Sequence, residues 1–157
     1  MPDETTHVNI ASTSDDWRGR ALSNFALSPF VFDGVLFASI EGFIQGIKFP
    51  ESDPRRQQAF HLAGWDAKRI GAQAERSGAY WQGQCLVYGS VAHQQVIEAA
   101  IRARMAQSTG LQEALVSTAD AVIIHDTGQP ESTTTSLPGT VFCRLMTAIR
   151  DELRRTV

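Results

Sequence analysis

Glu41, Gln45 and Lys48 are the residues whose types and spacing could support catalysis. At about 100° per residue in a helix, their side chains fall within a stripe roughly 60° wide. A carboxyl group can carry protons to and from a substrate, and a lysine amine that has lost its proton can attack a carbon atom. The spacing therefore allows acid–base and covalent chemistry, although it also fits an ordinary solvent-facing surface of a helix.

The neighbours of this stripe favour the wall of a pocket. Ile40, Ile44 and Ile47 form an apolar stripe directly beside it, whereas solvent-facing polar residues would normally lie on the opposite side. Gly42 and Gly46 lie on the far side, and each costs about 1 kcal/mol relative to alanine in a helix. This cost indicates that another backbone approaches the helix there.

Lysine is scarce in this chain. Of the 14 basic residues, 12 are arginine and only two, Lys48 and Lys68, are lysine. Lysine can lose its proton and act as a nucleophile, whereas arginine effectively cannot. The skew reflects either a specific need for lysine or codon usage and chance. Lys48 has a carboxylate two turns away, but the sequence identifies no partner for Lys68.

The elements that must position these residues belong to an α+β domain that is mostly helical with a small β-sheet. The aromatic and β-branched runs on either side of Asp33-Gly34 predict a hairpin, and Ser39 is the expected N-cap of the helix that carries Glu41. We expect residues 1–157 to form a single domain, with 1–7 disordered. The expected elements are a strand over 8–11, a turn or short helix at 15–20, the hairpin over 29–37, helices over 40–49, 54–63, 66–70, 90–107 and 111–116, a strand over 121–125, a polar loop over 126–139 and a helix over 141–155.

Composition excludes several classes of protein. The chain has 157 residues, a net charge of −3, 43% hydrophobic and 20% charged residues, as in a globular protein rather than a disordered chain. No apolar run approaches the roughly 18–20 residues that span a bilayer, and residues 1–16 lack a signal peptide. Two cysteines and four scattered histidines form no disulfide framework or zinc motif. We expect a cytoplasmic protein without a metal, and the acidic balance argues against sequence-independent binding of duplex DNA.

A set of short motifs runs through the first third of the chain. They are Leu22-Ser23-Asn24-Phe25, Pro29-Phe30, Asp33-Gly34, Phe37, Ser39-x-Glu41 and Gln45-x-x-Lys48-Phe49, followed more weakly by Ala67-Lys68-x-x-Gly71, Trp81, Leu115-x-x-Thr118 and Leu145-Met146-x-x-Ile149-Arg150. In order and spacing they resemble the YbiA-like proteins, also called the NADAR family. The resemblance covers about residues 20–155 and implies a YbiA-like fold.

The resemblance also implies hydrolysis of an N-glycosidic bond. Family members act on ribosylamino-pyrimidine phosphates of riboflavin synthesis or remove ADP-ribose from guanine in nucleic acid. In both substrates the ribose is attached to an exocyclic amino nitrogen, whose lone pair can open the sugar ring to an imine. Lys48 would then form a Schiff base and Glu41 would move the protons. The expected partner is a small phosphorylated ribosyl substrate or ADP-ribosylated guanine in nucleic acid, with no cofactor and no membrane.

Other mechanisms and functions stay open from the sequence. If Lys48 only binds phosphate, Glu41 would be the general acid or base in direct attack by water. The usual pair of glycosidase carboxylates is not evident, which favours the lysine route. The main alternative function is a non-hydrolytic sensor that binds ADP-ribose or another NAD-derived nucleotide. A purely structural domain is the third possibility.

The family match extends the expected site beyond the catalytic pair Glu41 and Lys48. The expected substrate-binding residues are Asn24, Phe25, Gln45, Lys68, Trp81 and Asp126. Their alternatives are a turn residue for Asn24, core residues for Phe25 and Trp81, and a solvated surface for Lys68. Outside this set, we expect Arg104 and Arg150 on helix surfaces, Cys85 and Cys143 in the core and His125 facing a loop.

One region departs from the family pattern. Many members carry an Asp-x-x-Trp-Gly motif before the last helix, but no tryptophan follows Asp126 here. Asp126 is the candidate for the matching carboxylate. Because long polar loops often act as lids or specificity elements, the loop that starts at Asp126 predicts a divergent substrate preference.

Overall fold

Seven helices and six short strands make up residues 6–156, the part of the chain that the computed structural model describes. In chain order they are β1 (His7–Asn9), α1 (Trp17–Leu22), β2 (Phe30–Phe32), β3 (Val35–Phe37), α2 (Ile40–Gly46), α3 (Pro54–Phe60), α4 (Gly64–Gly71), β4 (Ala79–Trp81), β5 (Gln84–Leu86), α5 (Val91–Ala106), α6 (Thr109–Ser117), β6 (Val122–Ile124) and α7 (Gly139–Arg155). The expected mostly helical α+β fold is confirmed.

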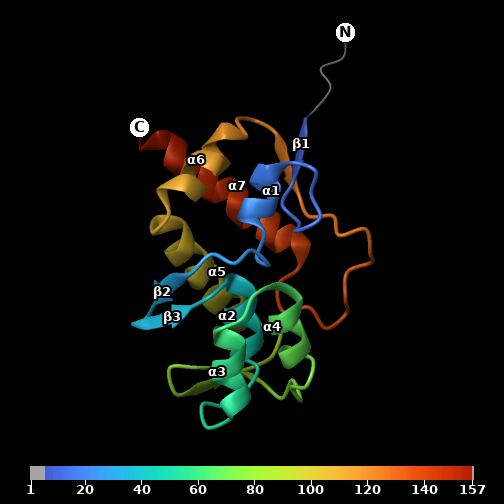
Figure 1. Cartoon of the computed structure of the whole chain (residues 1–157), viewed down its shortest axis with the longest axis vertical. Coiled ribbons are helices and arrows are strands. Elements are labelled where there is room, and N and C mark those ends of the chain that lie inside the picture. Colours follow the sequence, from blue (N-terminus) through green and yellow to red (C-terminus); the bar gives the residue numbers. More distant parts are fainter. Residues whose placement is uncertain (1–5, 157) are drawn as a thin grey trace.

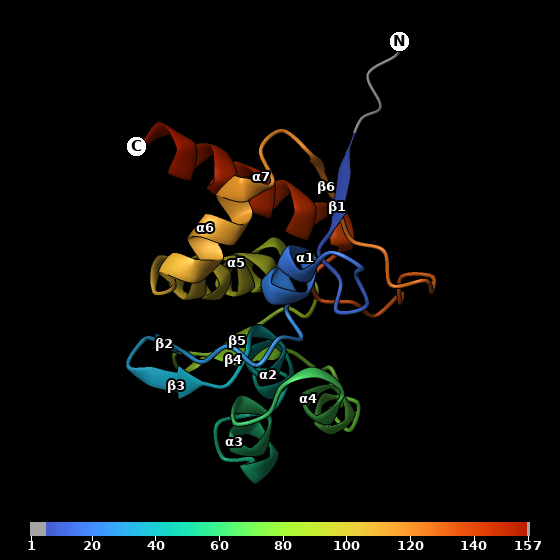
Figure 2. The ribbon, with the colours of Figure 1, turned by 45° about the horizontal axis from the view of Figure 1, so that its top comes forward.

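The elements form two groups on either side of α5 (Figures 1 and 2). One group contains α1, α6, α7 and the β1–β6 pair. The other contains α2, α3, α4 and the two hairpins. Helix α5 packs against α2 and β2 on one side and against α6 on the other, so it joins the groups.

The strands form three separate two-stranded sheets rather than the one small sheet that we expected. β1 and β6 pair in parallel, with Val8 opposite Ile123, and β2 pairs with β3 in an antiparallel hairpin. As predicted, Asp33 (φ 52°) and Gly34 (φ 74°) form the turn of that hairpin. Of the segment 1–7 that we expected to be disordered, residues 1–5 lie outside the described residues and His7 begins β1.

A third pair, β4 and β5, was missed by the sequence prediction. Its turn residues Gln82 (φ 51°) and Gly83 (φ 75°) both have positive φ, as in a type I′ hairpin. Gln-Gly is a weaker hairpin signal than Asn-Gly or Asp-Gly, which explains the miss. The backbone N–H of Tyr80 in β4 donates to the carbonyl oxygen of Ile47 at 2.7 Å, so this hairpin is tied to the end of α2.

Several helix boundaries differ from the prediction. α2 was expected to reach Phe49 but ends at Gly46, and the chain continues in tighter turns. The Ser108 hydroxyl accepts the N–H of Leu111, so α6 starts at Thr109 instead of 111. α3 ends earlier, at Phe60, whereas α4 and α7 start two residues earlier than expected, at Gly64 and Gly139.

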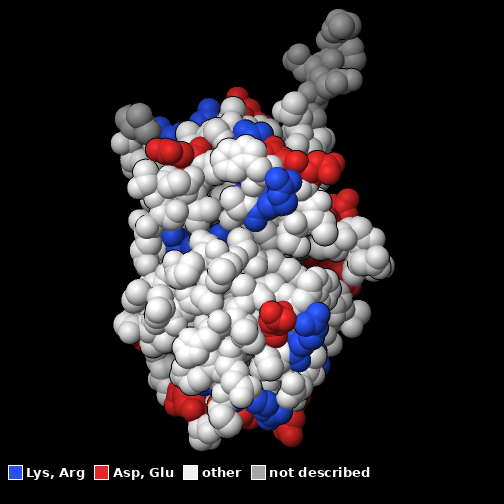
Figure 3. Space-filling view, viewed as in Figure 1, with Lys and Arg blue, Asp and Glu red and all other residues white. Residues whose placement is uncertain are grey.

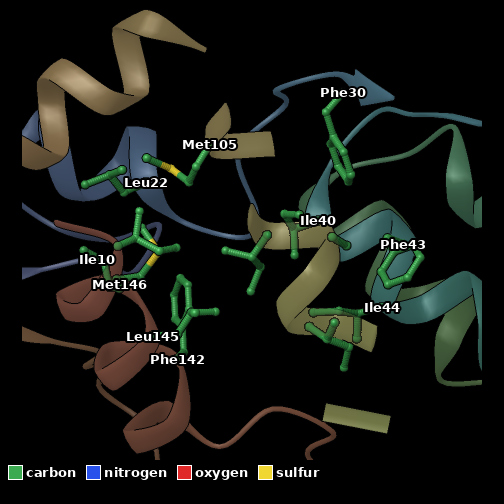
Figure 4. Packing of buried hydrophobic residues seen from close by; sticks show 14 of the residues in the cluster. Ile10, Leu22, Phe30, Ile40, Phe43, Ile44, Met105, Phe142, Leu145 and Met146 are labelled. Atoms are coloured by element: carbon green, nitrogen blue, oxygen red, sulfur yellow. The ribbon is translucent and has the colours of Figure 1, made fainter. Parts of the chain in front are cut away.

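The hydrophobic core runs through both groups of elements (Figure 4). Phe142, Leu145 and Met146 of α7 pack near Ile10 and Leu22 at one end. At the other end, the apolar stripe of α2, with Ile40 and Ile44 among its members, packs against α5. The core therefore fixes α2, which carries Glu41 and leads to Lys48, against α5. Between residues 6 and 156, no helix has both the length and the apolar character needed to cross a membrane.

Candidate active site

Glu41 is a buried carboxyl group in the first turn of α2. Ser39 caps this helix through a 2.9 Å hydrogen bond from the Gly42 N–H, and the Glu41 N–H donates to the Asn24 carbonyl oxygen at 2.9 Å. The side chain is only 7% exposed. Burial raises the pKa of the carboxyl group, and the hydrogen bond from Gln45 and the charges of the two lysines offset part of this rise.

Gln45 holds the Glu41 carboxylate from one helical turn away. Its Nε2 donates to Glu41 Oε1 at 2.6 Å. On its other side, Gln45 packs so closely against Gly71 of α4 that a Cβ on Gly71 would collide with the carboxamide. Gln45 is buried, and its Oε1 has no hydrogen-bond partner within the described residues. The contact with α4 therefore fixes the amide that orients Glu41.

Lys48 follows α2 directly, after the C-cap residue Ile47, and its side chain is buried, with 8% of the residue exposed. Burial lowers the pKa of its amine from 10.5 to about 8. The negative charge of Glu41 offsets part of this lowering, whereas the charges of Arg76 and Lys68 add to it. Within residues 6–156, Lys48 forms no salt bridge within 4.0 Å. Its amine is therefore poised to lose a proton near neutral pH.

The glycines of α2 behave as predicted. A Cβ on Gly42 would lie 2.5 Å from the carbonyl oxygen of Ala59, and one on Gly46 would collide with the ring of Phe60. α3 therefore packs closely on the side of α2 away from the apolar stripe. This packing leaves the face with Glu41 and Lys48 directed toward α4 and α5.

His93 lies in the first turn of α5 and has no exposed surface. Burial and the charge of Lys48 lower the pKa of its imidazole to about 4, so the ring is neutral at pH 7. Its ring lies 5.0 Å from that of Tyr88, and the Lys48 amine lies 5.9 Å from the same Tyr88 ring. His93 was not singled out from the sequence.

A cluster of two aromatic rings and a cation lies at the α4 side of the site. Phe25 and Trp65 pack edge to face at 5.4 Å, and the amine of Lys68 lies 5.2 Å from the Trp65 ring and 5.7 Å from the Phe25 ring. Trp65 is 60% exposed and Lys68 is exposed as well. The charge of Lys68 acts on Glu41, Lys48 and His125, so this cluster belongs to the same region.

Arg104 holds the segment that leads to Asn24 and Phe25. It was expected on a helix surface, but it is buried and donates to the carbonyl oxygens of Ala21 (2.6 Å) and Ser23 (3.3 Å). Its burial is possible because these carbonyl oxygens at the C-terminal end of α1 need donors. The side-chain Oδ1 of Asn24 is buried without a hydrogen-bond partner among the described residues, which leaves an acceptor beside Glu41.

The polar loop over 126–138 reaches the same region. It is drawn orange to red on the outer side of Figure 1. The Tyr88 hydroxyl donates to the Thr134 carbonyl oxygen at 2.8 Å, and Lys48 lies against the Tyr88 ring. Asp126 is exposed, and its Oδ1 accepts the Gly128 N–H at 2.9 Å within its own turn. The loop therefore borders the site through Thr134, whereas the Asp126 carboxylate is engaged in a local turn.

Trp81 is buried and stacks on Phe32 at 5.4 Å, as in the core alternative that the sequence left open. Two further expectations need correction. Arg150 was expected on a helix surface, but it is buried. Its guanidinium group donates to Thr118 Oγ1 at 2.9 Å and to the Ala121 carbonyl oxygen at 2.8 Å. Cys85 is exposed rather than buried.

The face shown in Figure 3 carries a mixture of basic and acidic side chains. On the face shown in Figure 3, lysine and arginine side chains are sparse and alternate with acidic ones, so no continuous basic surface crosses it. Residues 6–156 also contain no group of three or more His, Cys, Asp or Glu side chains that could hold a metal ion.

The family model described as Bacteriophage protein GP30.3 matches residues 16–151. The chain belongs to this family. A relative in Enterobacteria phage T4, described as an uncharacterized 17.1 kDa protein in the Gp30-rIII intergenic region, is 32% identical over 142 residues. The match covers 87% of this chain and 93% of the phage T4 protein.

A solved structure shows the same fold. The NMR structure of the E. coli protein YbiA matches with a TM-score of 0.67 over 97% of this chain and 87% of that chain, at 24% sequence identity. The fold of this GP30.3 family member is therefore YbiA-like, as its motifs predicted.

Proposed function

We propose that the protein is an N-glycosidase that hydrolyses the bond between ribose C1 and the exocyclic amino nitrogen of a ribosylated base. The observation that carries the proposal is a pair of buried groups with opposite pKa shifts, raised at Glu41 and lowered at Lys48. A raised pKa favours the protonated carboxyl group that can give a proton, and a pKa of about 8 makes the amine easier to deprotonate than a free lysine. The YbiA-like fold and the resemblance to the NADAR family support the same reaction.

The proposed reaction begins with opening of the ribose ring. The lone pair of the exocyclic nitrogen forms a double bond to C1, the bond from C1 to the ring oxygen breaks, and Glu41 gives that oxygen a proton. The neutral amine of Lys48 then adds to C1. Glu41 moves a proton from the Lys48 nitrogen to the base nitrogen, and the base leaves as a free amine.

The resulting Schiff base joins C1 of the open sugar to Lys48. Water adds to C1, the C1–nitrogen bond breaks, and the sugar leaves as an aldehyde that closes to ribose. The amine of Lys48 is restored without any redox step. Because Gln45 donates to Glu41 Oε1, its place in the reaction is to orient the carboxyl group rather than to touch the substrate.

The substrate class follows from the groups around the pair. Trp65 offers an exposed ring for a base, and the cation of Lys68 beside it suits a phosphate. Asn24 adds a free carbonyl acceptor for a ribose hydroxyl or a base amine. These features fit both a ribosylamino-pyrimidine phosphate and an ADP-ribosylated guanine.

The test uses the full-length protein with both substrates. Release of the free base is followed by chromatography, and borohydride is added to reduce any Schiff base to a stable adduct that mass spectrometry can locate. We expect turnover of one substrate and an adduct on Lys48. The Lys48→Met variant should lose both, whereas the matched Lys68→Met variant should bind more weakly but still be trapped at Lys48.

Two results would redirect the proposal. Unchanged turnover in Lys48→Met would exclude the Schiff base and leave Glu41 as the general acid or base for direct attack by water. Tight binding of ADP-ribose by the wild-type protein, with no turnover of either substrate, would instead favour the non-hydrolytic sensor.

A further inference from the structure

His93 is a buried ionisable residue that the proposed reaction leaves without a role. Its backbone N–H donates to the hydroxyl of the N-cap residue Ser90 at 3.2 Å, and its ring Nδ1 accepts the Gly89 N–H at 3.0 Å. Because Nδ1 accepts a hydrogen bond, the neutral ring must carry its proton on Nε2. The loop before α5 therefore fixes both the position and the tautomer of this imidazole.

The Nε2–H group has no partner among the described residues, although the whole residue is buried. A buried donor without an acceptor lowers the stability of a folded protein, and such groups are uncommon. An apolar side chain of similar size would fill the same space without this cost. A bound ligand that supplies an acceptor would remove this cost.

His93 lies near Lys48. The Tyr88 ring contacts the His93 ring at 5.0 Å and lies 5.9 Å from the Lys48 amine, and the charge of Lys48 acts on the imidazole. α5, which carries His93, packs against α2, after which Lys48 follows. His93 and Lys48 therefore border the same aromatic ring, next to the amine at which the sugar carbon would react.

A neutral donor suits this position better than a cation. Burial and Lys48 keep the pKa of His93 at about 4, so the ring can donate without adding a positive charge beside Lys48. A charged group there would oppose the formation of the protonated intermediates on the Lys48 nitrogen. Oxygen atoms of the ribose are uncharged acceptors that both proposed substrates share.

We propose that the Nε2–H of His93 donates a hydrogen bond to a ribose oxygen of the substrate and holds the sugar against Lys48. This inference rests on the proposed N-glycosidase function and adds a third group to the pair of Glu41 and Lys48.

Two amide variants test the hydrogen-bonding roles of the two ring nitrogens, Nδ1 and Nε2, one at a time. In His93→Asn the side-chain oxygen can still accept from Gly89, but no donor reaches the position of Nε2. In His93→Gln the amide nitrogen reaches that position. We expect His93→Gln to stay within about threefold of the wild-type kcat/KM and His93→Asn to lose about tenfold or more, at similar melting temperatures. His93→Leu should lose activity as His93→Asn does. Equal activity of His93→Asn and the wild type would overturn the proposal, as would losses that only follow the melting temperature.

A measurement without turnover separates this inference from the proposed function. In protein labelled with ¹⁵N-histidine, the Nε2-bound proton of His93 should shift downfield when ribose 5-phosphate or ADP-ribose is added. No shift with either sugar would overturn the role of His93. A shift in a wild-type protein that hydrolyses neither proposed substrate would retain the sugar contact and reject the glycosidase.

Discussion

Replacing Lys48 with methionine should make the folded protein more stable while it abolishes the proposed activity. The pKa of Lys48 falls from 10.5 to about 8 on folding, which means that the fold disfavours the charged amine. Each pKa unit corresponds to about 1.36 kcal/mol, so the charge costs about 3 kcal/mol at pH 7. Methionine has a similar length and carries no charge, and it should recover much of this free energy.

The pH dependence of the gain has a defined sign. Below pH 8 the amine is protonated in both the folded and the unfolded chain, so the cost is constant. Between pH 8 and 10.5 the unfolded chain binds more protons than the folded one, and the stability of the wild-type protein therefore rises with pH. The advantage of Lys48→Met should shrink over this window and be nearly gone at its upper end.

Urea and thermal unfolding at pH 7 and pH 10, followed by circular dichroism, measure the effect. At about 2–4 °C per kcal/mol for a chain of this size, the variant should melt roughly 6–12 °C higher at pH 7. Lys68→Met, at an exposed position, should stay within about 0.5 kcal/mol of the wild type and serves as the control. A Lys48→Met variant that is no more stable at pH 7, or equally favoured at both pH values, would refute the reasoning.

Glycine positions give three further predictions. Gly71→Ala should push the Gln45 carboxamide off Glu41 and so raise the pKa of Glu41 further. The limb of the pH–kcat/KM profile that reports Glu41 should then move to higher pH. An unchanged profile would show that Gln45 does not orient the carboxyl group. Gly42→Ala should lower the free energy of unfolding by about 1–3 kcal/mol in urea titrations, because its Cβ would meet backbone oxygens of α3 and the turn after it at 2.5 and 2.6 Å. Gly110→Ala, with its nearest neighbour at 4.0 Å, should instead stabilise α6 by up to about 1 kcal/mol, and an equal loss in both variants would contradict the packing argument.

Local signals in the sequence predicted the elements around the site. Asp33-Gly34 predicted the first hairpin because both residues tolerate positive φ, and Ser39 predicted the start of α2 because its hydroxyl caps the free N–H groups. Gln82-Gly83 forms the same kind of turn but was missed, since glutamine seldom adopts positive φ and the flanking strands are short. The end of α2 was placed too late, because tightening after Gly46 depends on contacts with β4.

Helical periodicity in the sequence also predicted the central residues of the candidate site. Glu41, Gln45 and Lys48 lie close together in sequence, so α2 and the tight turn that follows it set their relative positions. His93, Trp65 and Arg104 come from other helices, and no spacing in the sequence relates them to Glu41. Buried arginines in particular look like surface charges in a sequence, because the carbonyl groups that accept from them are distant in the chain.

The sequence by itself determined the fold class, the first hairpin, the capped start of α2 and the stripe that carries the carboxyl and amine groups. These features depend on the conformational preferences of single residues and on spacing within one helix, and both are local. Only the tertiary structure decided which residues surround the stripe and how strongly they are buried. A pKa shift depends on the removal of water and on charges from remote segments. The shifted pKa values of Glu41, Lys48 and His93 therefore arise only once α2, α4 and α5 have packed together.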